Sequence, residues 1–294
     1  MLLTLAAALT VAAAQQMDTT VAAQRGQRLQ VNAFGGDVTI GAWTRDAVQI
    51  QASTPGRTRV EIGVTATSVS VRTQGRQGPP ADVDLRITAP VWMAVSVSGV
   101  QTNAKVEGVR APISVETVEG EISVNGGDGL ISLRSVQGSV SLQGAKGRIS
   151  VNSVNEDVRV TNSAGEVLAE TVNGEITLDG VDAATVDANT VNGDIAYAGP
   201  IRNGGRYALS THNGDITLTV AQGSSANVTV STFNGEFESE FPVPLSGTRK
   251  GKGFSFILGT GSAQVTLESF QGTIELVRPG SRKDRERRER QEDD

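Results

Sequence analysis

The chain has 294 residues, a formal net charge of −6 at pH 7 and no cysteine. Its acidic balance argues against nucleic-acid binding, which depends on Lys and Arg to neutralise phosphates. The small basic cluster of Arg249, Lys250 and Lys252 is explained as a solvated loop. Without cysteine the chain forms no disulfide and carries no cysteine-linked lipid. Aromatic residues make up only 4% of the sequence, so the core is expected to be thin and aliphatic, unlike that of a globular enzyme.

The first segment, residues 1–14, is expected to be a secretory signal peptide. Apart from two threonines it is small and apolar from Leu2 to Ala14, and it ends in three alanines, as an export cleavage site does. The run is too short to span a bilayer. The mature chain is therefore expected to have no transmembrane helix and to be periplasmic, on the cell surface or extracellular. Because no Lys or Arg precedes the run, the true start codon stays open, and a buried N-terminal helix is the alternative.

Residues 15–97 are predicted to form a β-rich N-terminal cap or the first coils of a repeat. Apolar and polar residues alternate there, as in the stretch from Val83 to Ile87, which is the period of a β-strand. A stack of coils needs an atypical end, because a bare terminal coil exposes its core and an unpaired strand edge.

Between residues 98 and 278 one six-residue phrase recurs: Thr or Ser, an apolar residue, Asn, Gly, an acidic residue, then Ile or Val. Four successive copies lie 18 residues apart, and the spacing later stretches to 19 and 21. The chain has ten copies, which begin at Ala33, Gly99, Thr117, Ser135, Ser153, Thr171, Thr190, Thr211, Thr232 and Ser269. The copies at Ala33 and Gly99 are weak, and the one at Ala33 lies within the predicted cap. A short fixed period marks a solenoid, in which each repeat buries its apolar face against its neighbours.

The predicted fold is all-β, a parallel β-helix or β-solenoid of about 18–21 residues per coil. Each coil has two short strands and two bends; for example, Ile176 is expected in the core and Thr177 on the solvent face. An Asn-Gly pair between apolar runs also signals a hairpin, so an antiparallel meander is the alternative. The 37 residues between Gly235 and Gly272 are about two coils long, which predicts a degenerate intermediate coil around residues 251–254.

Stacked coils would align two polar columns. The asparagines of the phrase are expected to form a ladder of side-chain amides; they are Asn155, Asn173, Asn192, Asn213 and Asn234. The residues after the glycine form a carboxylate column of Glu121, Asp157, Glu175, Asp194, Asp215 and Glu236. We expect a solvated face there, because Ser139 interrupts the row and Arg159 lies nearby. A low-affinity ladder for Ca²⁺ or another polyvalent cation is the alternative; no other metal site and no cofactor is predicted.

The closing segment, residues 279–294, is predicted to be a disordered tail. From Ser281 onward it has no apolar residue and mixes Arg with Asp and Glu. Pairing between Glu and Arg makes a short charged helix the alternative.

Several of these features together resemble one known family. They are the strand-rich lead-in with Gly41 to Trp43, the approach from Ile87 to Pro90, the serial Thr-Val-Asn-Gly phrases and the closing stretch from Gln264 to Leu276. Over nearly all of the mature chain this order is similar to the bacterial putative-adhesin family of β-strand repeat proteins, a domain of unknown function numbered 4097. The resemblance implies a β-solenoid outside the cytoplasmic membrane, and it supplies no catalytic residue.

No catalytic site is predicted. The single histidine, His212, takes the place in the phrase that Val or Phe holds elsewhere, so it is expected to be a packed or rim residue. The expected function is that of a non-catalytic exported adhesin or structural scaffold, whose unknown partners include envelope glycans and proteins. The alternative is a carbohydrate-active β-helix enzyme, a lyase or hydrolase on an acidic polysaccharide. It would need an acid and a base in a groove, with Trp43, Trp92, Tyr197 and Tyr207 as candidate sugar platforms.

Overall fold

The computed structural model describes residues 15–54, 58–75, 81–243 and 253–281. The expected signal peptide, the basic cluster around Lys250 and most of the expected tail lie outside these ranges. All 24 described elements are β-strands, and they belong to one continuous hydrogen-bonded sheet. In the same ranges there is no helix long and apolar enough to cross a membrane.

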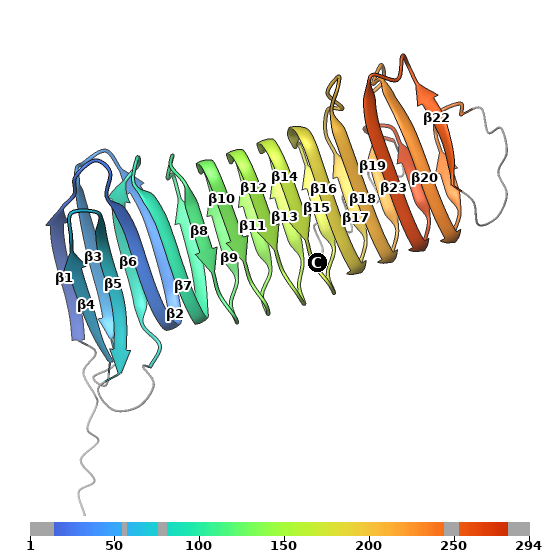
Figure 1. Cartoon of the computed structure of the whole chain (residues 1–294). Helices are drawn as coiled ribbons and strands as arrows, with labels where there is room; N and C mark the ends of the chain where they lie inside the picture. The colour runs from blue at the N-terminus through green and yellow to red at the C-terminus, as the bar shows by residue number, and fades with distance from the viewer. Residues whose placement is uncertain (1–14, 55–57, 76–80, 244–252, 282–294) are drawn as a thin grey trace, which may run out of the picture.

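The middle of the chain is a parallel β-solenoid whose coils each contribute one strand to each of two layers (Figure 1). The first layer contains β8 (Ile113–Glu116), β10 (Asp128–Arg134), β12 (Lys146–Asn152), β14 (Ala164–Glu170), β16 (Asp182–Asn192) and β18 (Arg206–Asn213). The second layer contains β9 (Ile122–Asn125), β11 (Val140–Gln143), β13 (Val158–Thr161), β15 (Ile176–Asp179), β17 (Ile195–Ala198) and β19 (Ile216–Thr219). Equivalent residues pair in register; Ile131, for example, lies between Ile113 and Ile149. The predicted parallel stacking is thus confirmed, and the alternative of an antiparallel meander is wrong for these coils.

The core between the layers follows from the alternation of apolar and polar residues along each strand. Isoleucine, valine and leucine of successive coils stack in columns that are almost wholly buried, as at Ile122, Val140, Val158 and Ile176. Two large rings depart from the expected aliphatic filling, because Tyr197 and Tyr207 are also fully buried.

The turn between the two strands of each coil is built by the hydroxyl and the glycine of the phrase. The hydroxyl points inward and donates a hydrogen bond to the turn of the preceding coil; Thr211 Oγ1, for example, donates to Gly193 O at 2.9 Å. Equivalent buried donors are Thr117, Ser135, Ser153, Thr171, Thr190 and Ser269. The glycine is required by close approach, because a Cβ on Gly214 would overlap the carbonyl oxygen of Gly193.

The N-terminal end combines two long strands that serve both layers with a cap of antiparallel strands. The long strands are β2 (Arg28–Trp43) and β7 (Ala94–Glu107), which pair with each other in parallel. The other strands are β1 (Gln15–Ala22), β3 (Ala47–Thr54), β4 (Thr58–Val64), β5 (Ser68–Gly75) and β6 (Asp84–Pro90). On the side away from β7, β2 pairs in parallel with β5 and β6. Antiparallel pairing of β4 with β5, of β3 with β6 and of β1 with β3 closes this end.

The C-terminal end departs from the order of the sequence. Its strands are β20 (Ala226–Asn234), β21 (Phe237–Ser239), β22 (Phe254–Leu258), β23 (Ala263–Gln271) and β24 (Ile274–Val277). The last repeat, β23 and β24, lies between the coil of β18 and β19 and the coil of β20 and β21. The expected degenerate coil around residues 251–254 is wrong. Phe254 instead begins β22, which pairs antiparallel with the outer side of β20. The chain turns back here because it must return before β23 can enter between β18 and β20.

Candidate functional site

The main candidate site is an apolar stripe on the outer surface, formed by the second residue of each phrase. This residue is the last outward-facing position of the first layer before the turn, so equivalent residues of neighbouring coils lie side by side. Along the rod the stripe consists of Phe34, Val100, Val118, Val136, Val154, Val172, Val191, His212, Phe270 and Phe233. The exposed fraction is 45% at Val118, 43% at Val191 and 60% at Phe233. Single exposed apolar residues are ordinary, but a contiguous row indicates an interaction surface.

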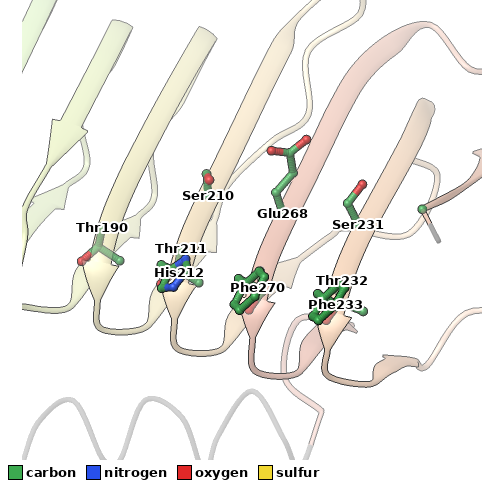
Figure 2. A pocket seen from close by; sticks show the side chains of 11 residues that line it. Thr190, Ser210, Thr211, His212, Ser231, Thr232, Phe233, Glu268 and Phe270 are labelled. Atoms are coloured by element: carbon green, nitrogen blue, oxygen red, sulfur yellow. The ribbon is translucent and has the colours of Figure 1, made fainter. Parts of the chain in front are cut away.

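Three rings stack at the C-terminal end of the stripe (Figure 2). Phe270 lies between the other two rings: its centroid is 4.6 Å from that of His212 and 4.9 Å from that of Phe233, and the planes are nearly parallel. The rim position expected for His212 is confirmed, because the residue is exposed and packs on Phe270. Since both faces of Phe270 are covered, this ring presents its edge to a ligand, whereas Phe233 at the end of the stack is 60% exposed.

Beside these rings an open groove of about 540 Å³ runs over the outward face of β18, β23 and β20. Each strand also places a polar side chain in this groove, two residues before its ring (Figure 2). These side chains are Ser210, Glu268 and Ser231. Glu268 is the one carboxylate among the lining residues, and His212 is their one other ionisable group. The groove therefore offers apolar rings, the outward hydroxyls of Ser210 and Ser231 and the single negative charge of Glu268.

The predicted amide ladder is present for four of its five asparagines along the turn next to the stripe, whereas Gln271 of the inserted repeat lies between Asn213 and the fifth, Asn234. Asn173 Nδ2 donates to Asn155 Oδ1 at 3.0 Å, and Asn192 Nδ2 donates to Asn173 Oδ1 at 2.9 Å. Asn213 continues the row by donating to Asn192 Oδ1 at 2.8 Å. The side-chain amides therefore bond to each other along the rod, and an uncharged polar edge borders the stripe.

The carboxylate column is also aligned, and several members have a structural role. Asp194 Oδ1 accepts the backbone N–H of Asp215 at 2.8 Å, and Asp157 Oδ1 accepts that of Glu175 at 2.7 Å. Each of these exposed side chains thus ties its turn to the next coil at the surface of the rod. The insertion of the last repeat places Thr273 between Asp215 and Glu236, and Asp215 Oδ1 accepts the N–H of Thr273. Among the described residues no group of three or more His, Asp or Glu has the arrangement of a metal site.

We expect the simultaneous replacement of Glu175 by Gln and of Asp194 and Asp215 by Asn to leave the fold intact. The amide oxygens still accept the backbone N–H groups, and the removed charges repelled each other across neighbouring coils by roughly 0.9 kcal/mol per pair in water. Thermal melts should show an unchanged or slightly higher Tm, and millimolar Ca²⁺ should shift neither protein. A calcium-dependent rise in Tm of several degrees that is lost in the triple variant would establish the cation ladder instead.

The four aromatic residues predicted as candidate sugar platforms do not line the groove near His212. Tyr197 and Tyr207 meet edge to face at 5.6 Å inside the core, and Tyr197 donates its hydroxyl to Val181 O at 3.2 Å. Burial raises the pKa of both phenols. Their surface neighbour Asp182 accepts two hydrogen bonds from Arg202, and these bonds lower the pKa of its carboxyl.

Trp43 and Trp92 lie at the N-terminal end and are half-buried. Trp43 Nε1 donates to Ala47 O at 2.7 Å, and Trp92 Nε1 donates to Asp46 Oδ1 at 2.9 Å. Neither tryptophan lines the groove near His212. The structure therefore does not bring the four predicted platforms together.

Together these features define a rod-shaped β-solenoid with a continuous apolar stripe on one edge. Residues 26–277 match the model of the family described as Toastrack DUF4097, and the chain belongs to that family. None of the curated proteins matches the chain.

Three solved structures are among those to which the chain is similar. A putative adhesin from Bacteroides fragilis has 12% identity and a TM-score of 0.40, with 90% of this chain and 97% of that chain covered. A putative adhesin from Parabacteroides distasonis has 13% identity and a TM-score of 0.40, with coverage of 90% and 98%. A putative lipid binding protein from the same organism has 11% identity and a TM-score of 0.42, with coverage of 89% and 96%.

Proposed function

We propose that this protein is a non-catalytic exported rod that binds a protein partner of the cell envelope through its apolar stripe. The observation that carries the proposal is the continuity of the stripe over ten coils, where a solvated edge would carry polar residues. The apolar run from Leu2 to Ala14 supports export.

A protein partner fits the chemistry of the stripe better than a glycan. Sugars stack on free ring faces, and the faces of Phe270 are covered by His212 and Phe233. Valine side chains and ring edges instead match an apolar protein surface, while the neighbouring amide ladder supplies an uncharged rim for hydrogen bonds.

The enzyme alternative finds less support. A glycoside hydrolase uses two carboxyl groups on either side of the scissile bond, whereas Glu268 is the one carboxylate lining the groove. No member of the carboxylate column lines this groove, and Asp157, Asp194 and Asp215 accept backbone N–H groups of the next coil.

The stripe is tested by replacing Val118, Val172 and Val191 with Thr, which keeps the branched shape of each side chain and adds a hydroxyl. The fold should be unaffected because these side chains are exposed. Binding of the fluorescently labelled protein to isolated bacterial outer membranes, measured by flow cytometry, should weaken by about tenfold or more.

The matched control replaces Leu130 and Ile257 with Thr. Both are exposed apolar residues, at 57% and 61%, but neither belongs to the stripe. This control should bind like the unchanged protein. If the stripe variant bound as well as the unchanged protein, the stripe would not be the adhesive surface. Cleavage of a polyuronate by the unchanged protein would overturn the non-catalytic assignment.

A further inference from the structure

The last repeat of the described chain lies one coil inside the rod, and β2 near the N-terminus likewise has strands on both sides. Near the N-terminus, β2 is flanked by β7 on one side and by β5 and β6 on the other. Near the C-terminus, β23 lies between β18 and β20 (Figure 1), and β24 lies between β19 and β21. At the C-terminal end the outermost strands therefore come from an internal segment of the chain, whereas at the N-terminal end the first described strand, β1, lies on the outside and pairs with β3.

The inserted C-terminal coil is hydrogen-bonded on both sides. On its inner side, Gly214 N donates to Gln271 O at 2.9 Å. On its outer side, Ile274 N donates to Glu236 O, also at 2.9 Å. Leu267 and Leu276 of this coil are fully buried. The coil therefore has a complete ladder on each side and a place in the continuous core.

The N-terminal coil is held in the same way. Arg28 N donates to Thr67 O at 3.0 Å, and Val83 N donates to Gly35 O at 3.1 Å, so the outer strands bond to β2 through both of its halves. Leu29 and Ile40 of β2 are fully buried. β2 thus has hydrogen-bonded neighbours on both sides, but the first described strand, β1, lies outside it, so only the C-terminal end encloses the last repeat of the described chain.

We propose that the C-terminal end is a clasp, in which outer strands from an internal segment close over the last repeat and prevent the rod from unravelling from that end. The outer strands are β20, β21 and β22. In a solenoid stacked in chain order, the last coil has one neighbour and frays first, because each repeat is stabilised by nearest-neighbour contacts. Here the terminal coil is released only after the outer strands have left.

The clasp gives the rod a mechanical property that is independent of what the stripe binds. Tension applied at the C-terminal end acts first on a coil that has two hydrogen-bonded neighbours, so two ladders must break together. A rod under such a load therefore resists the release of one coil after another from that end.

Hydrogen–deuterium exchange of the whole chain, followed by mass spectrometry, tests the order of opening. Amides of β23 and β24 should exchange about tenfold or more slowly than those of β21 and β22, although they follow them in the sequence. At the other end, β2 should exchange more slowly than β1 and β4. Exchange of β23 and β24 at least as fast as that of β21 and β22 would overturn the clasp.

Two matched substitutions locate the effect. Ser269→Ala removes the hydroxyl that donates to Gly214 O at 3.0 Å, and Ser135→Ala removes the equivalent bond to Gly120 O at 3.1 Å in the middle of the rod. Ser269→Ala should speed exchange of β23 and β24 several-fold and leave β22 unchanged, whereas Ser135→Ala should leave all three unchanged. Equal acceleration of β23 and β24 by both variants would show general destabilisation and would contradict the proposal.

Discussion

Replacement of Ile176 by Asp should lower the free energy of unfolding by roughly 3–5 kcal/mol, because it places an unpaired carboxylate in the aliphatic core. Ile176 is fully buried and pairs with Val158 on one side and Ile195 on the other, so no water reaches the position. Urea denaturation followed by circular dichroism measures the change.

The control for this substitution is Ser141→Asp on β11. Ser141 faces outward, is half-buried and lies beside Arg159 of the next coil, so a carboxylate there should change the stability by about 0.5 kcal/mol or less. Thr177 is unsuitable as a control: the expectation that it faces solvent is wrong, since it is only 5% exposed and its hydroxyl donates to Glu175 Oε1 at 3.0 Å. Similar losses at Ile176 and Ser141 would show that the inward and outward faces of the strands are wrongly assigned.

The sequence predicts the coil and its columns well, because both depend on local patterns that repeat. Alternation fixes which residues face the core, and the fixed spacing brings equivalent positions together, so the amide ladder follows from Asn155, Asn173 and Asn192 alone. Thr177 shows the limit of alternation, because an outward residue can still be covered by its neighbours on the same face.

The order of the coils at the C-terminal end is not predictable in this way. Every copy of the phrase is chemically alike, so the copy at Ser269 fits equally well beside Thr211 or beyond Thr232, and only the whole set of contacts decides. The aromatic end of the stripe depends on that choice. Phe233 and Phe270 stand far apart in sequence, and they stack with His212 only because the last repeat is inserted between the two preceding coils.

Replacement of Gly214 by Ala should lower the free energy of unfolding by roughly 3 kcal/mol, because the turns of neighbouring coils approach each other too closely for a Cβ at this position. The added Cβ would overlap the carbonyl oxygen of Gly193 in the neighbouring coil, which is the acceptor for the buried hydroxyl of Thr211. Relief of the overlap would require the two turns to separate, and overpacking of this kind commonly costs about 1–3 kcal/mol before any hydrogen bond is lost.

Gly41→Ala separates this steric effect from the general consequences of exchanging glycine for alanine. Gly41 lies in β2, and a Cβ built there meets no atom within 4 Å. Alanine should therefore be neutral or should stabilise the protein by about 0.5 kcal/mol, because it restricts the unfolded chain. Thermal and urea denaturation of the two variants should thus change in opposite directions. If Gly214→Ala were tolerated as well as Gly41→Ala, the glycine of the phrase would serve only the bend, and the coils would not need to approach each other so closely at their turns.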